Sequence, residues 1–362
     1  MTNVPSTPSL VIDLPTATRN IERLAKYGKE HRLAIRPHTK THKSIGIAKL
    51  QLLHGADGLT VAKVGEAEVM REASDDLFIA YPIFDAARLE RLTALAKTAS
   101  MRVAIDSTAA ASAISSAAHS AGVTIGILVD LDVGFHRTGL QTPDLSLQLA
   151  QLVDRLPGLR LDGLFTYPGH IFTPVAAQLP ELQRIDQLIQ EARLLWKTSG
   201  LEMRVVSGGS TPTAYQSHHV TSLTEIRPGT SVYNDMNCVM GGYCTLDNVA
   251  ARFTCTVVSD AVPGKVVIDA GTKTFTSDRN AAQPDFGNGY LIEYPEARIV
   301  RCSEEHGEVN IANCPRAPKL GERVTVIPNH ICPCINLQDR VFVRTEDGKL
   351  EPWSVDARGK LT

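Results

Sequence analysis

Over its first 240 residues, the chain alternates short β-branched runs with longer segments of helical periodicity. In segments such as DAARLERLTALAKTA, apolar residues recur at three- and four-residue spacing, as in an amphipathic helix. The strand-like runs are LAIRP (33–37), GLTVA (58–62), LFIAY (77–81), RVAID (102–106), TIGILVDLD (124–132), LDGLFTY (161–167), RVVSGG (204–209) and TEIRPG (224–229). This alternation predicts an α/β fold whose parallel strands close into a (β/α)8 TIM barrel. An open doubly wound sheet is the alternative, but it normally carries a GxGxxG loop after its first strand, and the chain has none.

The pattern changes after about residue 245, where short β-rich segments are separated by Gly, Pro and Asp. Examples are ARFTCTVVSDAV, KVVIDAG, ERVTVIP and DRVFVRTEDGKL. They predict a C-terminal antiparallel β domain, and SLVIDL near the N-terminus also reads as a strand. We therefore expect a barrel over residues 15–245 and a β domain made of residues 1–14 and 246–362.

Charge and hydropathy exclude several classes of partner for this chain of 362 residues. The formal net charge of −2 gives no strong field for nucleic acid or an anionic membrane. No apolar run approaches the roughly 18 residues that a membrane-spanning helix needs. The N-terminus lacks the pattern of a signal peptide, and the seven cysteines are widely spread. A cytoplasmic protein with free thiols is the expectation.

The stretch RPHTKTHKS, residues 36–44, follows the first predicted strand. Active sites of such barrels lie at the carboxyl ends of the strands, so Lys40 can project into the mouth of the barrel. Desolvation there lowers the pKa of an amine and makes it a better nucleophile toward an aldehyde. The alternative is an ordinary surface lysine. The sequence does not say which way His38 and His42 point.

Two loops with small and hydroxyl residues follow the seventh and eighth predicted strands. SGGSTPTA covers residues 207–214, and RPGTSVYND contains Gly229, Thr230 and Tyr233. Backbone amides of such loops can bind a phosphate, and TIM barrels often bind phosphate at these two strands. Each loop alone is as readily a glycine-rich turn, but together they favour a phosphate site.

Polar candidates also follow the fifth and sixth strands. Arg137, in DVGFHRTGL, can donate to an oxygen anion at the barrel mouth, or it forms a surface salt bridge. Tyr167 and His170 lie in YPGH, where catalytic groups of a barrel gather, although a lone histidine is more often structural.

The predicted β domain carries PNHICPCINLQD. His330 and Cys332 are two residues apart, so on a strand they would face the same side. One imidazole and one thiolate make half of a zinc site, which water or substrate can complete. As a motif HxC is weak, and Cys334 is read as a bystander.

Taken together, these motifs resemble the fold-type III pyridoxal-phosphate enzymes, which have the alanine-racemase-like fold. Within this group the chain is similar to the D-threonine aldolase and D-serine dehydratase branch. The resemblance covers essentially the whole chain, in order. Its motifs here are TPSLVIDL, RPHTKTHK, SGGSTPTA, RPGTSVYND, DAGTK, EEHG and PNHICPCINLQD.

The resemblance implies a role for each candidate. Lys40 would bind pyridoxal 5'-phosphate as a Schiff base, and Lys43, placed in the following helix, would be a bystander or a charge at the helix entry. Arg137 would contact the phenolate oxygen of the cofactor, and Tyr167 would lie close to its ring. The phosphate would be held by Gly208, Gly209, Ser210, Thr211, Gly229 and Tyr233. His330 and Cys332 would bind a divalent metal, with zinc favoured over manganese or magnesium.

The same resemblance implies a lyase for small β-hydroxy-D-amino acids, working as a homodimer. His-x-Cys at the metal favours a dehydratase that releases a keto acid and ammonia from D-serine or D-threo-3-hydroxyaspartate. The alternative is retro-aldol cleavage to glycine and an aldehyde. For that reaction the expected base position is near Thr173, and the nearest histidine is His170. An amino-acid racemase and a non-catalytic cofactor carrier are further alternatives.

Overall fold

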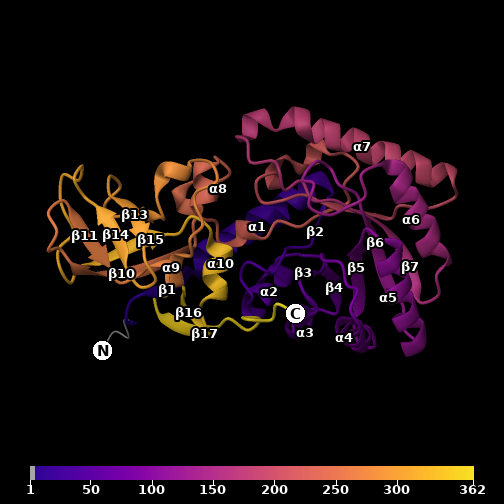
Figure 1. Cartoon of the computed structure of the whole chain (residues 1–362), viewed down its shortest axis with the longest axis horizontal. Helices are drawn as coiled ribbons and strands as arrows, with labels where there is room; N and C mark the ends of the chain where they lie inside the picture. The colour runs from indigo at the N-terminus through magenta and orange to yellow at the C-terminus, as the bar shows by residue number, and fades with distance from the viewer. Residues whose placement is uncertain (1–4) are drawn as a thin grey trace. The chain divides into compact units, whose positions relative to one another are not determined.

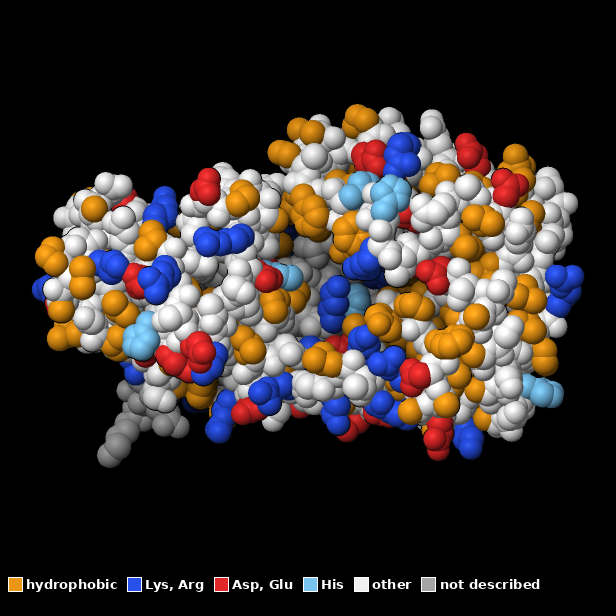
Figure 2. All heavy atoms as spheres, viewed as in Figure 1, with side chains coloured by type: hydrophobic (Ala, Val, Ile, Leu, Met, Phe, Trp, Pro, Cys, Tyr) orange, Lys and Arg blue, Asp and Glu red, His pale blue; other side chains and the backbone are white. Residues whose placement is uncertain are grey.

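The computed structural model describes residues 5–362, and the chain divides into two compact units. Unit 1 comprises Met1–Ile21, Thr41–Lys43 and Thr230–Arg358, and unit 2 comprises Glu22–Lys40, Ser44–Gly229 and Gly359–Thr362. The first four residues of the predicted β domain lie outside the described residues. On the face shown in Figure 2, basic and acidic side chains are interspersed over the surface.

Unit 2 contains eight parallel strands, and all eight predicted strands are confirmed. They are β2 (Ala34–Ile35), β3 (Leu59–Val61), β4 (Asp76–Ile79), β5 (Ser100–Ile105), β6 (Ile125–Asp130), β7 (Leu159–Phe165), β8 (Val205–Gly208) and β9 (Glu225–Ile226). Their order is β2-β9-β8-β7-β6-β5-β4-β3. A parallel bridge between His38 and Thr60 joins the chain after β2 to β3, so the sheet closes into the predicted barrel.

Helices surround the strands of this barrel in Figure 1. Those of the strand–helix alternation are α1 (Leu14–His31), α2 (Ile45–Leu53), α3 (Val64–Met70), α4 (Ala86–Ala96), α5 (Thr108–Ala121), α6 (Pro143–Arg155) and α7 (Leu179–Thr198), and short 3-10 helices lie at η1 (Val175–Ala177) and η2 (Ala214–His219). Asp85, Ser107 and Thr142 each cap a helix by accepting a hydrogen bond from a backbone amide of its first turn. Local sequence therefore sets where these helices begin.

The barrel interior holds an apolar layer and a charged network. Phe78, Ala104, Leu128 and Phe165 form the apolar cluster. In the network, the guanidinium of Arg36 binds Glu225 at 3.0 Å and Asp76 at 2.8 Å. Arg102 then binds Asp76 at 3.1 Å and Asp162 at 2.9 Å. Each buried charge is thereby paired, which is the condition under which a protein interior accepts charges.

Unit 1 is built on a nine-stranded sheet of order β13-β14-β11-β10-β1-β16-β17, with β15 pairing β10 and β12. Its strands are β1 (Ser9–Asp13), β10 (Ala251–Ser259), β11 (Lys265–Ile268), β12 (Tyr290–Leu291), β13 (Arg298–Cys302), β14 (Gly307–Asn310), β15 (Arg323–Ile327), β16 (Arg340–Arg344) and β17 (Leu350–Ser354). Its short helices are η3 (Thr230–Val232), α8 (Met236–Met240), η4 (Leu246–Asn248), α9 (Thr272–Phe275), η5 (Pro284–Phe286) and α10 (Ile331–Asn336).

The predicted N-terminal strand is confirmed as β1, which pairs antiparallel with β10 and parallel with β16. The sheet is therefore mixed, and the purely antiparallel arrangement expected for this domain is wrong at that one pair. The reason is topological, because no hairpin links β1 to β16 and so their relative direction is not constrained to be antiparallel. No helix of the described residues is long and apolar enough to cross a membrane.

Candidate functional site

The loop after β2 presents Lys40 at the carboxyl end of the barrel strands, where the sequence predicted it. The preceding residue, Thr39, is buried and donates its amide to the carbonyl of Thr60 at 2.8 Å. Its hydroxyl donates to the same carbonyl at 3.1 Å, so the loop is anchored on β3. Lys40 itself is exposed, and the described residues do not provide the desolvation expected for its amine.

Lys43 does not lie in the following helix, so that prediction is wrong. Helix α2 begins at Ile45, because the hydroxyl of Ser44 caps it by accepting the amide of Ile47. Lys43 precedes the cap, is buried in unit 1 and has a φ of 51°. Its carbonyl accepts the amide of Ala357 at 2.9 Å. His42 is also buried, and His38 is half-buried.

The loops after β8 and β9 lie at the same edge of the barrel, because these strands pair with Gly208 opposite Ile226. A Cβ atom at Gly208 would come within 2.5 Å of the Leu223 side chain, and Gly209 has a φ of +74°. Gly209 therefore has a backbone conformation that favours glycine, whereas a side chain at Gly208 would have to displace the end of the Leu223 side chain. The loop can approach a ligand with its backbone rather than with side chains.

Not every residue of the predicted phosphate loop is available to a ligand. The amide of Ser210 donates to the hydroxyl of Thr213 at 3.1 Å. Within residues 5–362, no acceptor binds the amides of Gly209, Thr211 and Gly229. Free amides after two neighbouring strands fit an anion such as a phosphate. Tyr233, the remaining candidate, is buried in unit 1, and burial raises the pKa of its hydroxyl.

The loop after β6 carries Arg137. The centre of its guanidinium lies 4.9 Å from the ring centroids of both Phe135 and Tyr167, so it stacks on two aromatic rings. The carboxylate of Asp132 accepts the amides of Gly134, Phe135 and His136 and shapes the turn before the arginine. The arginine is exposed, so its guanidinium is accessible to a ligand.

His170 is held by a carboxylate. Its Nε2 lies 2.8 Å from an oxygen of Glu181, which also binds Arg184. Among the described residues, its buried Nδ1 has no hydrogen-bond partner. The ring is fixed at one nitrogen by the start of α7, and this contact is not visible in the local sequence.

His330 and Cys332 lie at the start of α10, not on a strand, so the expected strand geometry is wrong. His330 precedes the helix with an extended backbone, and Cys332 lies in its first turn. Their side chains do contact each other, as predicted. The contact is made by the turn at the start of the helix and not by one face of a strand. The sequence did not predict this helix, because periodicity cannot distinguish a helix from a strand in an apolar segment as short as ICPCIN.

Three side chains contact this pair, and all five residues belong to unit 1. His330 contacts Cys332, and its Nδ1 lies 2.8 Å from a carboxylate oxygen of Asp278. The hydroxyls of Thr41 and Thr230 lie 3.1 and 3.4 Å from the sulfur of Cys332. Thr41 is the chain neighbour of Lys40, so the RPHTKTHK motif supplies residues to both units.

His330 and Cys332 each shift the pKa of the other toward its charged form. Burial opposes ionisation of Cys332, but the hydrogen bonds and charge of His330 and the two threonine hydroxyls outweigh it and lower the thiol pKa. Burial also opposes the charged form of His330, but Cys332, Asp235 and Asp278 raise the imidazole pKa. A thiolate is the form in which cysteine binds metals. With Asp278 at Nδ1, the Nε2 of His330 is the nitrogen left for a metal, and the donor set fits zinc.

Cys334 is not part of this pair. Its thiol is buried and donates to the carbonyls of Phe275 and His330, at 3.4 and 3.1 Å. Burial raises the pKa of this thiol well above its usual value. In the described chain, no cluster of three His, Cys, Asp or Glu side chains is arranged to hold a metal.

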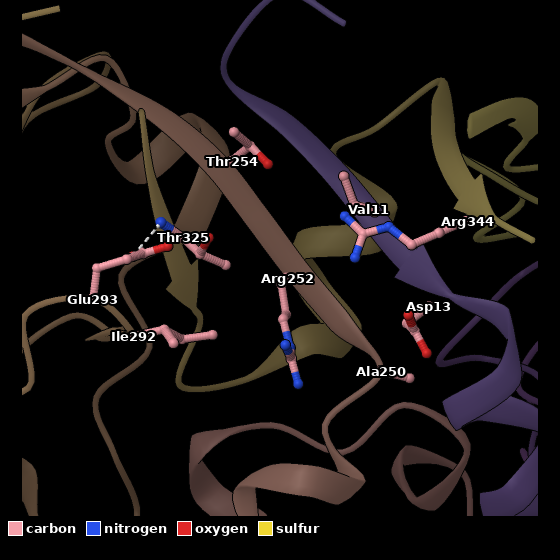
Figure 3. Close-up of a pocket in the computed structure, with 9 residues that line it drawn as sticks. All are labelled: Val11, Asp13, Ala250, Arg252, Thr254, Ile292, Glu293, Thr325 and Arg344. Atoms are coloured by element: carbon pink, nitrogen blue, oxygen red, sulfur yellow. Dashed lines mark hydrogen bonds between the residues drawn. The ribbon is translucent and has the colours of Figure 1, made fainter. Parts of the chain in front are cut away.

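A separate cavity of about 210 Å³ lies in unit 1 (Figure 3). It is lined by Val11, Asp13, Ala250, Arg252, Thr254, Ile292, Glu293, Thr325 and Arg344. Figure 3 shows Arg252 between Asp13 on one side and Glu293 on the other. None of the predicted site residues lines this cavity, so it is distinct from the His330–Cys332 pair.

Known proteins match the chain over nearly its whole length. The alanine racemase N-terminal domain family matches residues 12–237, and the putative serine dehydratase domain family matches residues 250–344. A D-threonine aldolase from Arthrobacter sp. is 32% identical and covers 98% of this chain and 93% of its own. The chain belongs to the D-threonine aldolase and D-serine dehydratase family. The alanine-racemase-like fold, the lyase class and the link to pyridoxal-phosphate enzymes expected from the sequence are thereby confirmed.

Other members of the family support the same assignment. A D-threo-3-hydroxyaspartate dehydratase from Delftia sp. (strain HT23) is also 32% identical, over 96% of both chains. The structure of a D-threonine aldolase from Filomicrobium marinum superposes with a TM-score of 0.90, at 30% identity, over 99% of this chain and 97% of that one. A D-threo-3-hydroxyaspartate dehydratase with one cysteine replaced by alanine, 28% identical over 97% of both chains at a TM-score of 0.90, was solved in a metal-free form.

Sequence reasoning missed the residues that support the family's motifs. Thr41 lies inside RPHTKTHK, so its proximity to the predicted lysine was a usable signal. Asp278 gave no signal, because it is 52 residues from His330. Thr230 was named as part of the predicted phosphate loop, but its contact with Cys332, 102 residues away, was not predicted. Asp130 lies inside the predicted strand TIGILVDLD and is the last residue of β6, so the sequence showed a carboxylate near the catalytic end of the barrel.

Proposed function

We propose that this chain is a pyridoxal-phosphate- and divalent-metal-dependent lyase acting on β-hydroxy-D-amino acids. We further propose that it acts as a dehydratase, releasing a keto acid and ammonia from substrates such as D-serine or D-threo-3-hydroxyaspartate. The observation that carries the proposal is the His330–Cys332 pair, which is contacted by Asp278 and two threonine hydroxyls. Relatives named as an aldolase and as a dehydratase are equally similar to the chain, so the reaction rests on this site.

The barrel residues would bind and orient the cofactor. Lys40, exposed at the end of β2, would supply the amine for covalent attachment. The free amides of Gly209, Thr211 and Gly229 would hold the phosphate, and Arg137 would donate to the phenolate oxygen. When bound, the cofactor supplies an electron sink for the negative charge that develops on the substrate's Cα. Tyr233, in unit 1, remains a predicted phosphate ligand.

The residues of unit 1 would bind the metal through one nitrogen and one sulfur. Asp278 fixes the His330 ring by accepting its Nδ1 proton, and Thr41 and Thr230 stabilise the Cys332 thiolate by donating hydrogen bonds. A metal with two protein ligands has further positions for water or substrate, and as a Lewis acid it polarises a hydroxyl. Zinc suits the nitrogen and sulfur donors better than manganese or magnesium.

The position of His170 favours dehydration over retro-aldol cleavage. An aldolase needs a base that removes the proton of the substrate hydroxyl. The Nε2 of His170 is held by Glu181 and its Nδ1 is buried, so neither nitrogen is accessible to a substrate hydroxyl in this arrangement. Retro-aldol cleavage is the second candidate, and it is distinguished by its products, glycine and an aldehyde.

A product assay tests the proposal. The enzyme is incubated with D-serine, D-threonine and D-threo-3-hydroxyaspartate, with and without EDTA, and keto acid is compared with glycine plus aldehyde. We expect keto acid, its loss with EDTA and its recovery with zinc. If the products are glycine and an aldehyde, the enzyme is an aldolase and the dehydratase assignment is wrong. Racemisation unaffected by EDTA would favour a racemase, and cofactor binding without turnover of any amino acid would favour a carrier.

Absorbance of the bound cofactor tests Lys40. The variant Lys40→Ala is expected to lose the long-wavelength band and the activity, because no other amine is expected to replace it. Lys49→Ala is the control, since Lys49 is an exposed lysine of the neighbouring helix α2. A Lys40→Ala protein that keeps both the band and full activity would contradict the assignment. The homodimer implied by the resemblance stays a prediction, which light scattering measures.

A further inference from the structure

Asp130 is a buried carboxyl group inside the mouth of the barrel. It is the last residue of β6, and only 5% of its surface is exposed. Side chains two apart on a strand face the same side, and Leu128 belongs to the apolar cluster of the barrel interior. Asp130 therefore points inward, one step closer to the end of the barrel where the cofactor is expected.

The loop that carries Arg137 is attached to this residue. The amide of Leu140 donates to the backbone carbonyl of Asp130 at 2.9 Å, and the hydroxyl of Thr138 donates to its carboxylate at 2.8 Å. Gly139 has a φ of +102°, and a Cβ atom there would come within 3.0 Å of the same carboxylate. The residues after Arg137 thus pass closely over Asp130, and the arginine is presented from a loop fixed at its C-terminal side.

Charged groups from three other elements act on Asp130. Arg137 on the loop and Arg227 after β9 favour its ionised form, whereas Asp106 after β5 disfavours it. Arg227 is itself buried, donating to the hydroxyl of Ser207 at 2.6 Å and to the carbonyl of Thr166 at 2.7 Å. Burial of Asp130 has the largest effect and raises its pKa to about 7. The group therefore changes charge near neutral pH, within electrostatic range of the arginine assigned to the cofactor.

We propose that Asp130 is a positioning residue that holds the Arg137 loop through Thr138 and sets the charge that a bound anionic cofactor meets at this arginine. Its ionised form offsets the positive charge of Arg137, and its protonated form leaves that charge available to the cofactor. Affinity for the cofactor then increases as pH falls through the titration of Asp130. The inference rests on the proposed function for the assignment of Arg137 to the cofactor.

The test is the dissociation constant of pyridoxal phosphate for the apoenzyme, measured by fluorescence quenching from about pH 6 to about pH 8. Wild type is compared with Asp130→Asn, which keeps an acceptor for Thr138 but carries no charge. Taking the ratio of the two constants at each pH cancels the titration of the ligand itself. At the upper end of the pH range, we expect Asp130→Asn to bind pyridoxal phosphate about three- to tenfold more tightly than wild type. At the lower end, we expect the dissociation constants of the two proteins to become equal.

A second variant keeps the carboxyl group and tests the link to the loop. Thr138→Val removes a hydrogen bond that favours the ionised form, so the midpoint of the pH dependence is expected to move to higher pH. This test stays valid if Asp130→Asn does not fold. The inference is overturned if the ratio of the wild-type and Asp130→Asn dissociation constants does not change with pH. It is also overturned if Thr138→Val has the same midpoint of the pH dependence as wild type. Failure of the wild-type apoenzyme to bind pyridoxal phosphate at all overturns the proposed function instead.

Discussion

The contact between Asp278 and His330 allows a quantitative prediction for the metal site. At 2.8 Å the carboxylate accepts the Nδ1 proton of His330, which fixes the ring and makes Nε2 a stronger ligand. Removing such a supporting group typically lowers metal affinity 10- to 100-fold. Asp278→Asn keeps an oxygen at this place but loses the charge, so we expect about a tenfold weaker zinc affinity. Asp278→Ala loses both, and we expect about a hundredfold weaker affinity.

The measurement is competition with a chromophoric zinc chelator, with metal content determined in parallel on dialysed protein. Asp285→Asn is the matched control, because Asp285 lies in the same segment of unit 1 and is exposed. Circular dichroism checks that each variant is folded. Equal zinc affinity in wild type and Asp278→Ala would refute the reasoning, because it would mean that His330 does not bind zinc through a ring held by this carboxylate.

Two further predictions concern the barrel. Arg36→Met leaves the buried carboxylate of Glu225 without its cation, so the free energy of unfolding measured in urea should fall by about 3–5 kcal/mol. The double variant Arg36→Met with Glu225→Gln should recover part of this loss, and no recovery would contradict the pairing. Burial and the neighbours His219 and His31 lower the pKa of His218, so the folded state resists its protonation. The free energy of unfolding should therefore fall as pH decreases below about 6.5, and His218→Asn should flatten this dependence between about pH 5 and about pH 7.

The barrel was predictable because its elements are encoded locally. The β-branched runs mark all eight strands, and the hydroxyl and acidic residues before the helices cap them. The carboxyl end of each strand is then known from chain direction alone, which is why Lys40 and the loop at Gly208 could be placed at one edge. The direction of β1 against β16 was not predictable, because no short turn joins them.

The amino-acid sequence by itself determined the order of the elements, the barrel and the residue types of the candidate site. Only the tertiary structure decided which side chains meet. It buried Lys43 in unit 1 and left Lys40 exposed. It brought Thr41 to Cys332 across 291 residues and Asp278 to His330 across 52. Periodicity and capping are properties of neighbouring residues, whereas burial and ionisation depend on distant segments that only the folded chain brings together.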